Sequence, residues 1–141
     1  PFLRYADKGC IILCKTSNPG SGDLQDLQLA SGEPLYMAVA RKAQDEWNAN
    51  CNVGLVVGAT YPGVLAKVRA TCPDLPLLVP GVGAQGGDLE AAVCAAADAH
   101  GEGVLINASR SVLYASAGTD FAAAARAEAQ RLRDQINRAR D

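Results

Sequence analysis

The sequence predicts an α/β fold built on a parallel sheet, and two observations lead to this prediction. Four short runs rich in Ile, Val and Leu, at 10–14, 53–57, 77–79 and 104–106, show no alternation of apolar and polar residues. Such runs are typical of strands that are buried on both faces, as parallel sheets require. A segment with helical periodicity follows each run, so the 141 residues form four strand–helix units in one domain.

The helical segments have recognisable ends and apolar stripes. Their expected boundaries are Pro34 for the start of the first helix, Thr60 and Pro62 for the second, Asp88 and His100 for the third, and Thr119 for the fourth. Trp47 falls on the apolar stripe of the first helix, which predicts a core residue rather than a ligand contact. The connection 16–32 is longer than most strand–helix loops, which makes it a candidate binding loop.

Composition excludes several function classes. Thirteen Lys and Arg against fifteen Asp and Glu give a formal charge of −2, so no basic field favours nucleic acid or an anionic membrane. Five cysteines without paired C-x-x-C spacing, and a single histidine, predict neither a metal site nor a disulfide framework. Without a long apolar segment or a secretory signal, the chain is expected to be cytoplasmic, with buried, reduced thiols.

The glycine-rich stretch 80–88, Pro-Gly-Val-Gly-Ala-Gln-Gly-Gly-Asp, contains the G-x-G-x-x-G spacing of a dinucleotide-binding loop. A dinucleotide site also needs an acidic residue about 20 residues further on, to bind the ribose hydroxyls. Asn107 and Arg110 stand at the end of the next apolar run instead. The dinucleotide interpretation is therefore weakened, and another phosphate remains a candidate ligand.

Two architectures accommodate four strand–helix units: an open doubly wound sheet, or a stretch of a (β/α)8 barrel, whose complete form needs roughly 250 residues. Barrels commonly bind phosphate with the loops after their last two strands. Here the last two runs end in the glycine loop and in Ser109-Arg110, which offer backbone N–H groups and a guanidinium. In the alternative interpretation, the glycines only form a tight turn and Arg110 is a solvated surface charge.

Three ordered motifs resemble orotidine 5′-phosphate decarboxylases, especially the longer bacterial branch of that family. They are Thr-Ser-Asn-Pro-Gly at 16–20, the glycine loop at 80–88, and Ser-Arg-x-x-Leu-Tyr-Ala at 109–115. The resemblance covers nearly the whole chain. It implies that the chain is the C-terminal half of a (β/α)8 TIM barrel and carries strands five to eight.

The resemblance also implies roles for individual residues. Ser17 corresponds to the residue that binds the amide edge of the pyrimidine, and Gln85 to the residue that spans pyrimidine and phosphate. Arg110 corresponds to the phosphate-binding arginine, beside the backbone amide of Ser109. With Pro80 and Gly83 of the glycine loop, these residues form the expected substrate-binding set. The family converts orotidine 5′-monophosphate to uridine 5′-monophosphate and carbon dioxide without metal or organic cofactor, typically as a homodimer.

One departure from the family pattern concerns the catalytic residues. The family's chemistry resides in an Asp-x-Lys-x-x-Asp motif, whereas this chain contains only an adjacent Asp7-Lys8. No catalytic residue is therefore expected here, and the missing N-terminal half is expected in the same polypeptide or in a separate chain. The alternatives are a half-barrel that binds nucleotide phosphates without turnover, and a sugar-phosphate isomerase or aldolase barrel.

Overall fold

A computed structural model describes residues 1–82 and 87–140, and it contains one parallel four-stranded sheet in the order β1-β2-β3-β4. The strands are β1 (Cys10–Lys15), β2 (Val53–Val57), β3 (Leu77–Pro80) and β4 (Val104–Asn107). All four predicted strands are confirmed, to within a residue at their ends.

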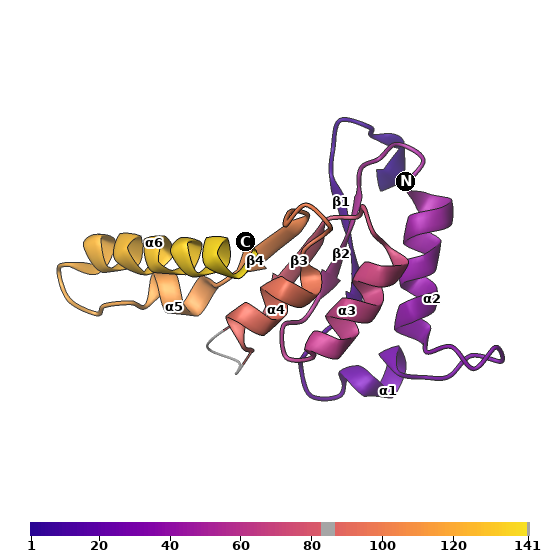
Figure 1. Cartoon of the computed structure of the whole chain (residues 1–141), viewed down its shortest axis with the longest axis horizontal. Coiled ribbons are helices and arrows are strands. Elements are labelled where there is room, and N and C mark those ends of the chain that lie inside the picture. Colours follow the sequence, from indigo (N-terminus) through magenta and orange to yellow (C-terminus); the bar gives the residue numbers. More distant parts are fainter. Residues whose placement is uncertain (83–86, 141) are drawn as a thin grey trace.

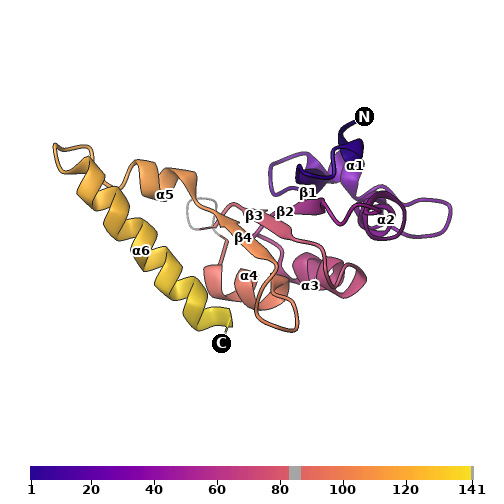
Figure 2. The same cartoon turned by 90° about the horizontal axis from the view of Figure 1, so that it is seen from above.

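Helices lie mainly along one face of this sheet (Figures 1 and 2). Their bounds are α1 (Ser21–Gln25), α2 (Leu35–Lys42), α3 (Pro62–Thr71), α4 (Leu89–Ala96), α5 (Ser109–Leu113) and α6 (Phe121–Arg140), with a π-helical turn η2 (Ala43–Trp47) after α2 and a short 3-10 turn η1 (Phe2–Arg4) near the N-terminus. Helices α3 and α4 lie side by side against the sheet, and α6 packs on α4. Trp47 packs against the core, as predicted from its place on the apolar stripe.

The strand residues that face the helices form the core. The register pairs Ile12 with Leu55, Leu55 with Leu77, and Leu77 with Val104, which gives one continuous row across the sheet. Leu55 and Leu77 are fully buried in this row. We call it the covered row.

The neighbouring register positions form a second apolar row on the opposite face. Leu13 pairs with Val56, Val56 with Leu78, and Leu78 with Leu105. Leu13 is 58% exposed and Leu105 is 52% exposed. Figure 2 shows no helix over β3 and β4 on this side, among the residues that the structure describes. We call these four residues the open row.

One arginine contacts the turns at the amino-terminal ends of β3 and β4. Arg69, on α3, is buried and donates five hydrogen bonds of 2.7–3.0 Å to backbone carbonyl oxygens. The acceptors belong to Ala96, Cys72, Pro73, Leu75 and Gly103. Burial lowers the pKa of Arg69 below its ordinary value. This guanidinium ties the turns that precede β3 and β4 to α3 and α4.

Helix boundaries agree with the sequence where the local hydrogen bonds are strong. Asp88 caps α4 as expected, since its carboxylate accepts a hydrogen bond of 3.1 Å from the Ala91 N–H. The expected cap at Thr60 is wrong: Tyr61 is the N-cap, because Pro62 takes the first helical position and holds the preceding residue out of the helix.

Two other boundaries lie inside those expected. Helix α4 ends at Ala96, before His100, because Asp98 accepts the His100 and Glu102 N–H groups, each at 2.8 Å, and so forms a separate turn. These two N–H groups also lower the pKa of Asp98. The last helix begins at Phe121, two residues after Thr119. Within the described residues, no helix is both long and apolar enough to cross a membrane.

Candidate functional site at the carboxyl ends of the strands

The described candidate residues all lie at the carboxyl ends of strands. Ser17 follows β1 by two residues, Pro80 is the last residue of β3, and Ser109 and Arg110 follow β4. Parallel strands place their carboxyl ends at one edge of the sheet, where (β/α)8 barrels carry their active sites. Gly83 and Gln85 lie outside the described residues, so their expected roles stay predictions.

A cleft of about 290 Å³ brings three of the candidates together. Pro80, Gly81 and Val82 line one side, and residues 107–111, which include Ser109 and Arg110, line the other. The pairing of Pro80 with Asn107 at the end of the β3–β4 ladder holds the two loops next to each other. Gly81 has φ +93°, a backbone conformation that favours glycine, so this turn depends on it.

Among the described residues that line this cleft, Arg110 is the one with a positively charged side chain. Arg110 is exposed, and no carboxylate among the described residues pairs with its guanidinium. The adjacent Ser109 hydroxyl donates to the Asn107 Oδ1 at 3.0 Å. An exposed fork of N–H donors next to a glycine turn is suited to a doubly charged phosphate.

Ser17 lies outside the lining of that cleft and occupies a separate position at the end of β1. Its hydroxyl oxygen is buried without a hydrogen-bond partner among the described residues. The oxygen packs against Gly58, where an added Cβ would lie 2.0 Å from it. The hydroxyl is therefore held in place by packing while both its donor and its acceptor capacity remain free.

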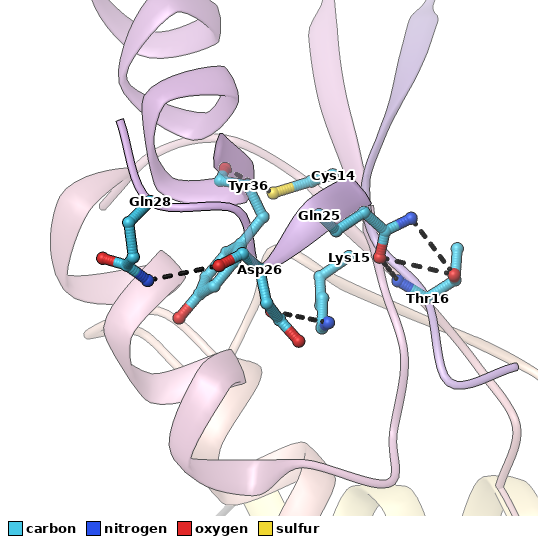
Figure 3. Close-up of polar contacts among 7 residues, drawn as sticks. All are labelled: Cys14, Lys15, Thr16, Gln25, Asp26, Gln28 and Tyr36. Atoms are coloured by element: carbon cyan, nitrogen blue, oxygen red, sulfur yellow. Dashed lines mark hydrogen bonds and ion pairs between the residues drawn. The ribbon is translucent and has the colours of Figure 1, made fainter. Parts of the chain in front are cut away.

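The sequence did not predict the side-chain contacts of the two residues directly before Ser17. Lys15 is a buried strand residue whose ammonium pairs with Asp26 at 2.7 Å, and Gln25 contacts Thr16 (Figure 3). A lysine directly after the apolar run 10–14 is the one signal that could have drawn attention to this cluster.

The cysteines are free thiols that do not form a site. Cys14 and Cys72 are buried, and burial raises the pKa of Cys14 to about 12 and that of Cys72 to about 11. Cys51 and Cys94 are exposed, so the expectation that the thiols are buried holds for only part of the set. Residues 1–82 and 87–140 contain no cluster of three or more His, Cys, Asp or Glu side chains able to hold a metal ion.

Comparison with known proteins identifies the family. The model of the orotidine 5′-phosphate decarboxylase / HUMPS family matches residues 2–127. The chain belongs to this family. The orotidine 5′-phosphate decarboxylase of Roseiflexus castenholzii is 65% identical over 139 residues, which are 99% of this chain and 51% of the relative. The Azoarcus enzyme of the same name is 59% identical over 97% of this chain and 50% of its own length.

Two solved structures have the same fold over this chain. Leishmania donovani UMP synthase aligns with a TM-score of 0.89 and 52% identity, over 99% of this chain and 30% of its own. Leishmania donovani OMP decarboxylase aligns with a TM-score of 0.86 and 49% identity, over 99% of this chain and 51% of its own. The four strand–helix units are thus part of a (β/α)8 barrel, and the open doubly wound sheet is excluded. The chain spans about half the length of the curated relatives it matches.

Proposed function

We propose that this chain supplies the phosphate and pyrimidine contacts of an orotidine 5′-phosphate decarboxylase, which converts orotidine 5′-monophosphate to uridine 5′-monophosphate and carbon dioxide. The observation that carries the proposal is the cleft in which Arg110 meets Pro80 and Gly81 at the carboxyl ends of β3 and β4. Membership of the family makes a nucleotide phosphate the natural ligand of that cleft.

In this proposal, each residue has a role set by its chemistry. Arg110 binds the phosphate through charge-assisted hydrogen bonds, assisted by the Ser109 amide, Pro80 and Gly83. The Ser17 hydroxyl donates to and accepts from the amide edge of the pyrimidine. Gln85 links the two ends of the nucleotide. No metal or organic cofactor takes part, and the reaction occurs in the cytoplasm.

We further propose that the catalytic Asp-x-Lys-x-x-Asp motif lies in a complementary N-terminal half-barrel, in the same polypeptide or in a second one. The open row supports this, because four adjacent apolar side chains on one face form a surface that water does not favour. Both sheet edges have apolar grooves as well. Residues such as Ile11 and Trp47 line the groove beside β1, and Ile106, Leu132 and Ile136 line the one beside β4.

Binding energy from the phosphate serves the chemistry at the base. Contacts remote from the reacting carbon can hold the substrate in its reactive position, so their loss lowers kcat as well as affinity. We also propose that two complete barrels associate as a homodimer.

The test joins this chain to the half of the Roseiflexus castenholzii decarboxylase that it does not match. Decarboxylation is followed by the formation of uridine 5′-monophosphate. We expect turnover by the joined protein, and a fall in kcat/KM of about a thousandfold in Arg110→Ala, since two charge-assisted hydrogen bonds contribute about 2 kcal/mol each.

The matched control is Arg126→Ala, which removes an exposed arginine of α6. It should leave kcat/KM unchanged. Unchanged kinetics in Arg110→Ala would overturn the phosphate assignment. Tight nucleotide binding without turnover would instead favour the non-catalytic nucleotide-binding module, and tight binding of ribose 5-phosphate with indifference to uracil would favour a sugar-phosphate enzyme.

A further inference from the structure

Gln25, the last residue of helix α1, and Asp26, its C-cap residue, contact the chain directly before Ser17 (Figure 3). The Gln25 Oε1 accepts a hydrogen bond of 2.9 Å from the Thr16 N–H. The Gln25 Nε2 also lies 3.2 Å from the Thr16 hydroxyl. One amide side chain thus satisfies both polar groups of Thr16 that could otherwise turn toward solvent.

Asp26, the residue after Gln25, fixes the preceding strand residue. Its Oδ1 lies 2.7 Å from the Lys15 Nζ, and the Lys15 side chain is only 5% exposed. The ammonium also lies 5.8 Å from the centre of the Tyr36 ring. The ion pair restricts the position of the Lys15 ammonium, because moving the ammonium away from Asp26 would leave a buried charge unpaired.

An irregularity in the strand directs Lys15 toward this partner. The β1–β2 register shifts between Leu13 and Lys15, and both Cys14 and Lys15 are buried although they are consecutive. A β-bulge re-aims side chains in this way and is frequent next to active sites. The Gly58 N–H then donates to the Lys15 carbonyl at 2.9 Å, which brings β2 against the same point.

Ser17 follows directly from these anchored residues. The absence of a side chain at Gly58 leaves room for this hydroxyl, since a Cβ at position 58 would lie 2.0 Å from the oxygen and 3.1 Å from the Ser17 nitrogen. Lys15, Thr16 and Ser17 are therefore each held by a different contact: an ion pair, a hydrogen bond and close packing.

We propose that Gln25 and Asp26 are positioning residues for pyrimidine recognition. By anchoring Thr16 and Lys15, they hold the Ser17 hydroxyl in its binding position before the nucleotide arrives. The inference rests on the proposed function of Ser17. It assigns specificity for the base to the carboxyl end of α1 and leaves phosphate affinity to Arg110.

The first test needs no ligand. In the joined protein described above, the Thr16 amide should exchange its hydrogen slowly, and Gln25→Ala should speed that exchange by about tenfold or more, since the hydrogen bond that protects it is gone. Gln25→Glu keeps an acceptor oxygen and should restore protection. Exchange that is equally fast in wild type and Gln25→Ala would overturn the proposal, whatever the nucleotide does.

The second test separates base from phosphate. We expect Gln25→Ala to raise the KM for orotidine 5′-monophosphate and the Kd for uridine 5′-monophosphate about fivefold, with the Kd for ribose 5-phosphate unchanged, because one part-buried hydrogen bond contributes about 1 kcal/mol. Gln25→Glu should recover most of the loss. Gln130→Ala, on exposed α6, is the matched control and should change none of these values.

A second variant covers the ion pair. Asp26→Asn alone leaves a buried ammonium unpaired, so both charges are removed together in Lys15→Met/Asp26→Asn, and thermal unfolding confirms that the variant is folded. A selective loss of base affinity supports the proposal. Equal losses for ribose 5-phosphate and the nucleotide, or no loss for either, contradict it. If wild type binds no uridine 5′-monophosphate, the proposed function fails, and the exchange result still decides whether α1 anchors Thr16.

Discussion

The two faces of the sheet both carry apolar side chains, but one face is covered by helices and the other is exposed. In the covered row, Leu55 and Leu77 are fully buried under α3 and α4. In the open row, one register position further along each strand, Leu13 and Leu105 are more than half exposed. Fully burying one leucine side chain contributes about 1.5–3 kcal/mol. The strand sequences therefore fit burial on both faces, whereas the helices of the described residues cover mainly one of them.

The largest effect on the free energy of unfolding is expected at Arg69, which joins the turns before β3 and β4 to α3 and α4. Arg69→Met keeps the apolar stem and removes all five donors, which leaves carbonyls of the turns before β3 and β4 without partners. We expect the free energy of unfolding to fall by about 4 kcal/mol in urea titrations. Arg138→Met, which removes one exposed hydrogen bond to the Asp134 carbonyl, should change it by less than about 0.5 kcal/mol. Equal effects would show that the network contributes little.

The two rows can be compared directly with a pair of leucine truncations. Leu77→Ala in the covered row should lower the free energy of unfolding by about 3 kcal/mol, because it leaves a cavity in a fully buried site. Leu105→Ala in the open row should lower it by less than about 1 kcal/mol in the chain alone. In the joined barrel the cost of Leu105→Ala should rise toward that of Leu77→Ala. A cost that stays small in both forms would mean that nothing covers the open row.

Gly58 tests the carboxyl end of the sheet. Gly58→Ala places a methyl group on the Ser17 hydroxyl, so Ser17 must move. In the joined barrel we expect about tenfold weaker binding of uridine 5′-monophosphate, equivalent to about 1.4 kcal/mol, by isothermal titration calorimetry. Affinity for ribose 5-phosphate should not change. Gly63→Ala, at a position where an added Cβ meets nothing within 4 Å, is the matched control.

The smallest expected effect is a pH dependence on the covered side. Burial raises the pKa of Cys14 from its ordinary value of 9.0 to about 12. Above about pH 9, the unfolded chain releases a thiol proton that the folded chain retains, so the free energy of unfolding falls as pH rises. Between pH 8 and pH 10 the contribution of Cys14 is about 1 kcal/mol. Urea titrations of wild type and Cys14→Ala at both pH values measure this contribution. If the free energy of unfolding changes equally with pH in both proteins, Cys14 is not the source of the pH dependence.

The strands could be predicted from the sequence because their apolar runs are dense and have clear ends. The helix cap at Asp88 was also readable, since its carboxylate acts on its own local backbone. Thr60 misled because the ring of Pro62 determines where α3 begins. A helix boundary could thus be predicted where a single residue and its own backbone neighbours determine it.

The parts that depend on distant contacts could not be predicted. Arg69 looks like an ordinary helix charge in the sequence, and its five acceptors come from three separate stretches of chain, at 72–75, 96 and 103. Helix α1 has only five residues and lies within what the sequence indicated as a loop. Arg110 was indicated by its place after the last apolar run, and Ser17 by the family resemblance, whereas the contacts of Gln25 with Thr16 and of Asp26 with Lys15 are visible only in the structure.

The most direct test of the account is a native mass spectrum of this chain mixed with the non-matching half of the Roseiflexus castenholzii relative and excess uridine 5′-monophosphate. The account predicts one complex that contains one copy of each half and one nucleotide, and Leu105→Asp should abolish it by placing a charge in the open row. A chain that remains alone, or pairs only with itself and binds no nucleotide, would contradict the claim that a complementary half covers this face and completes the site.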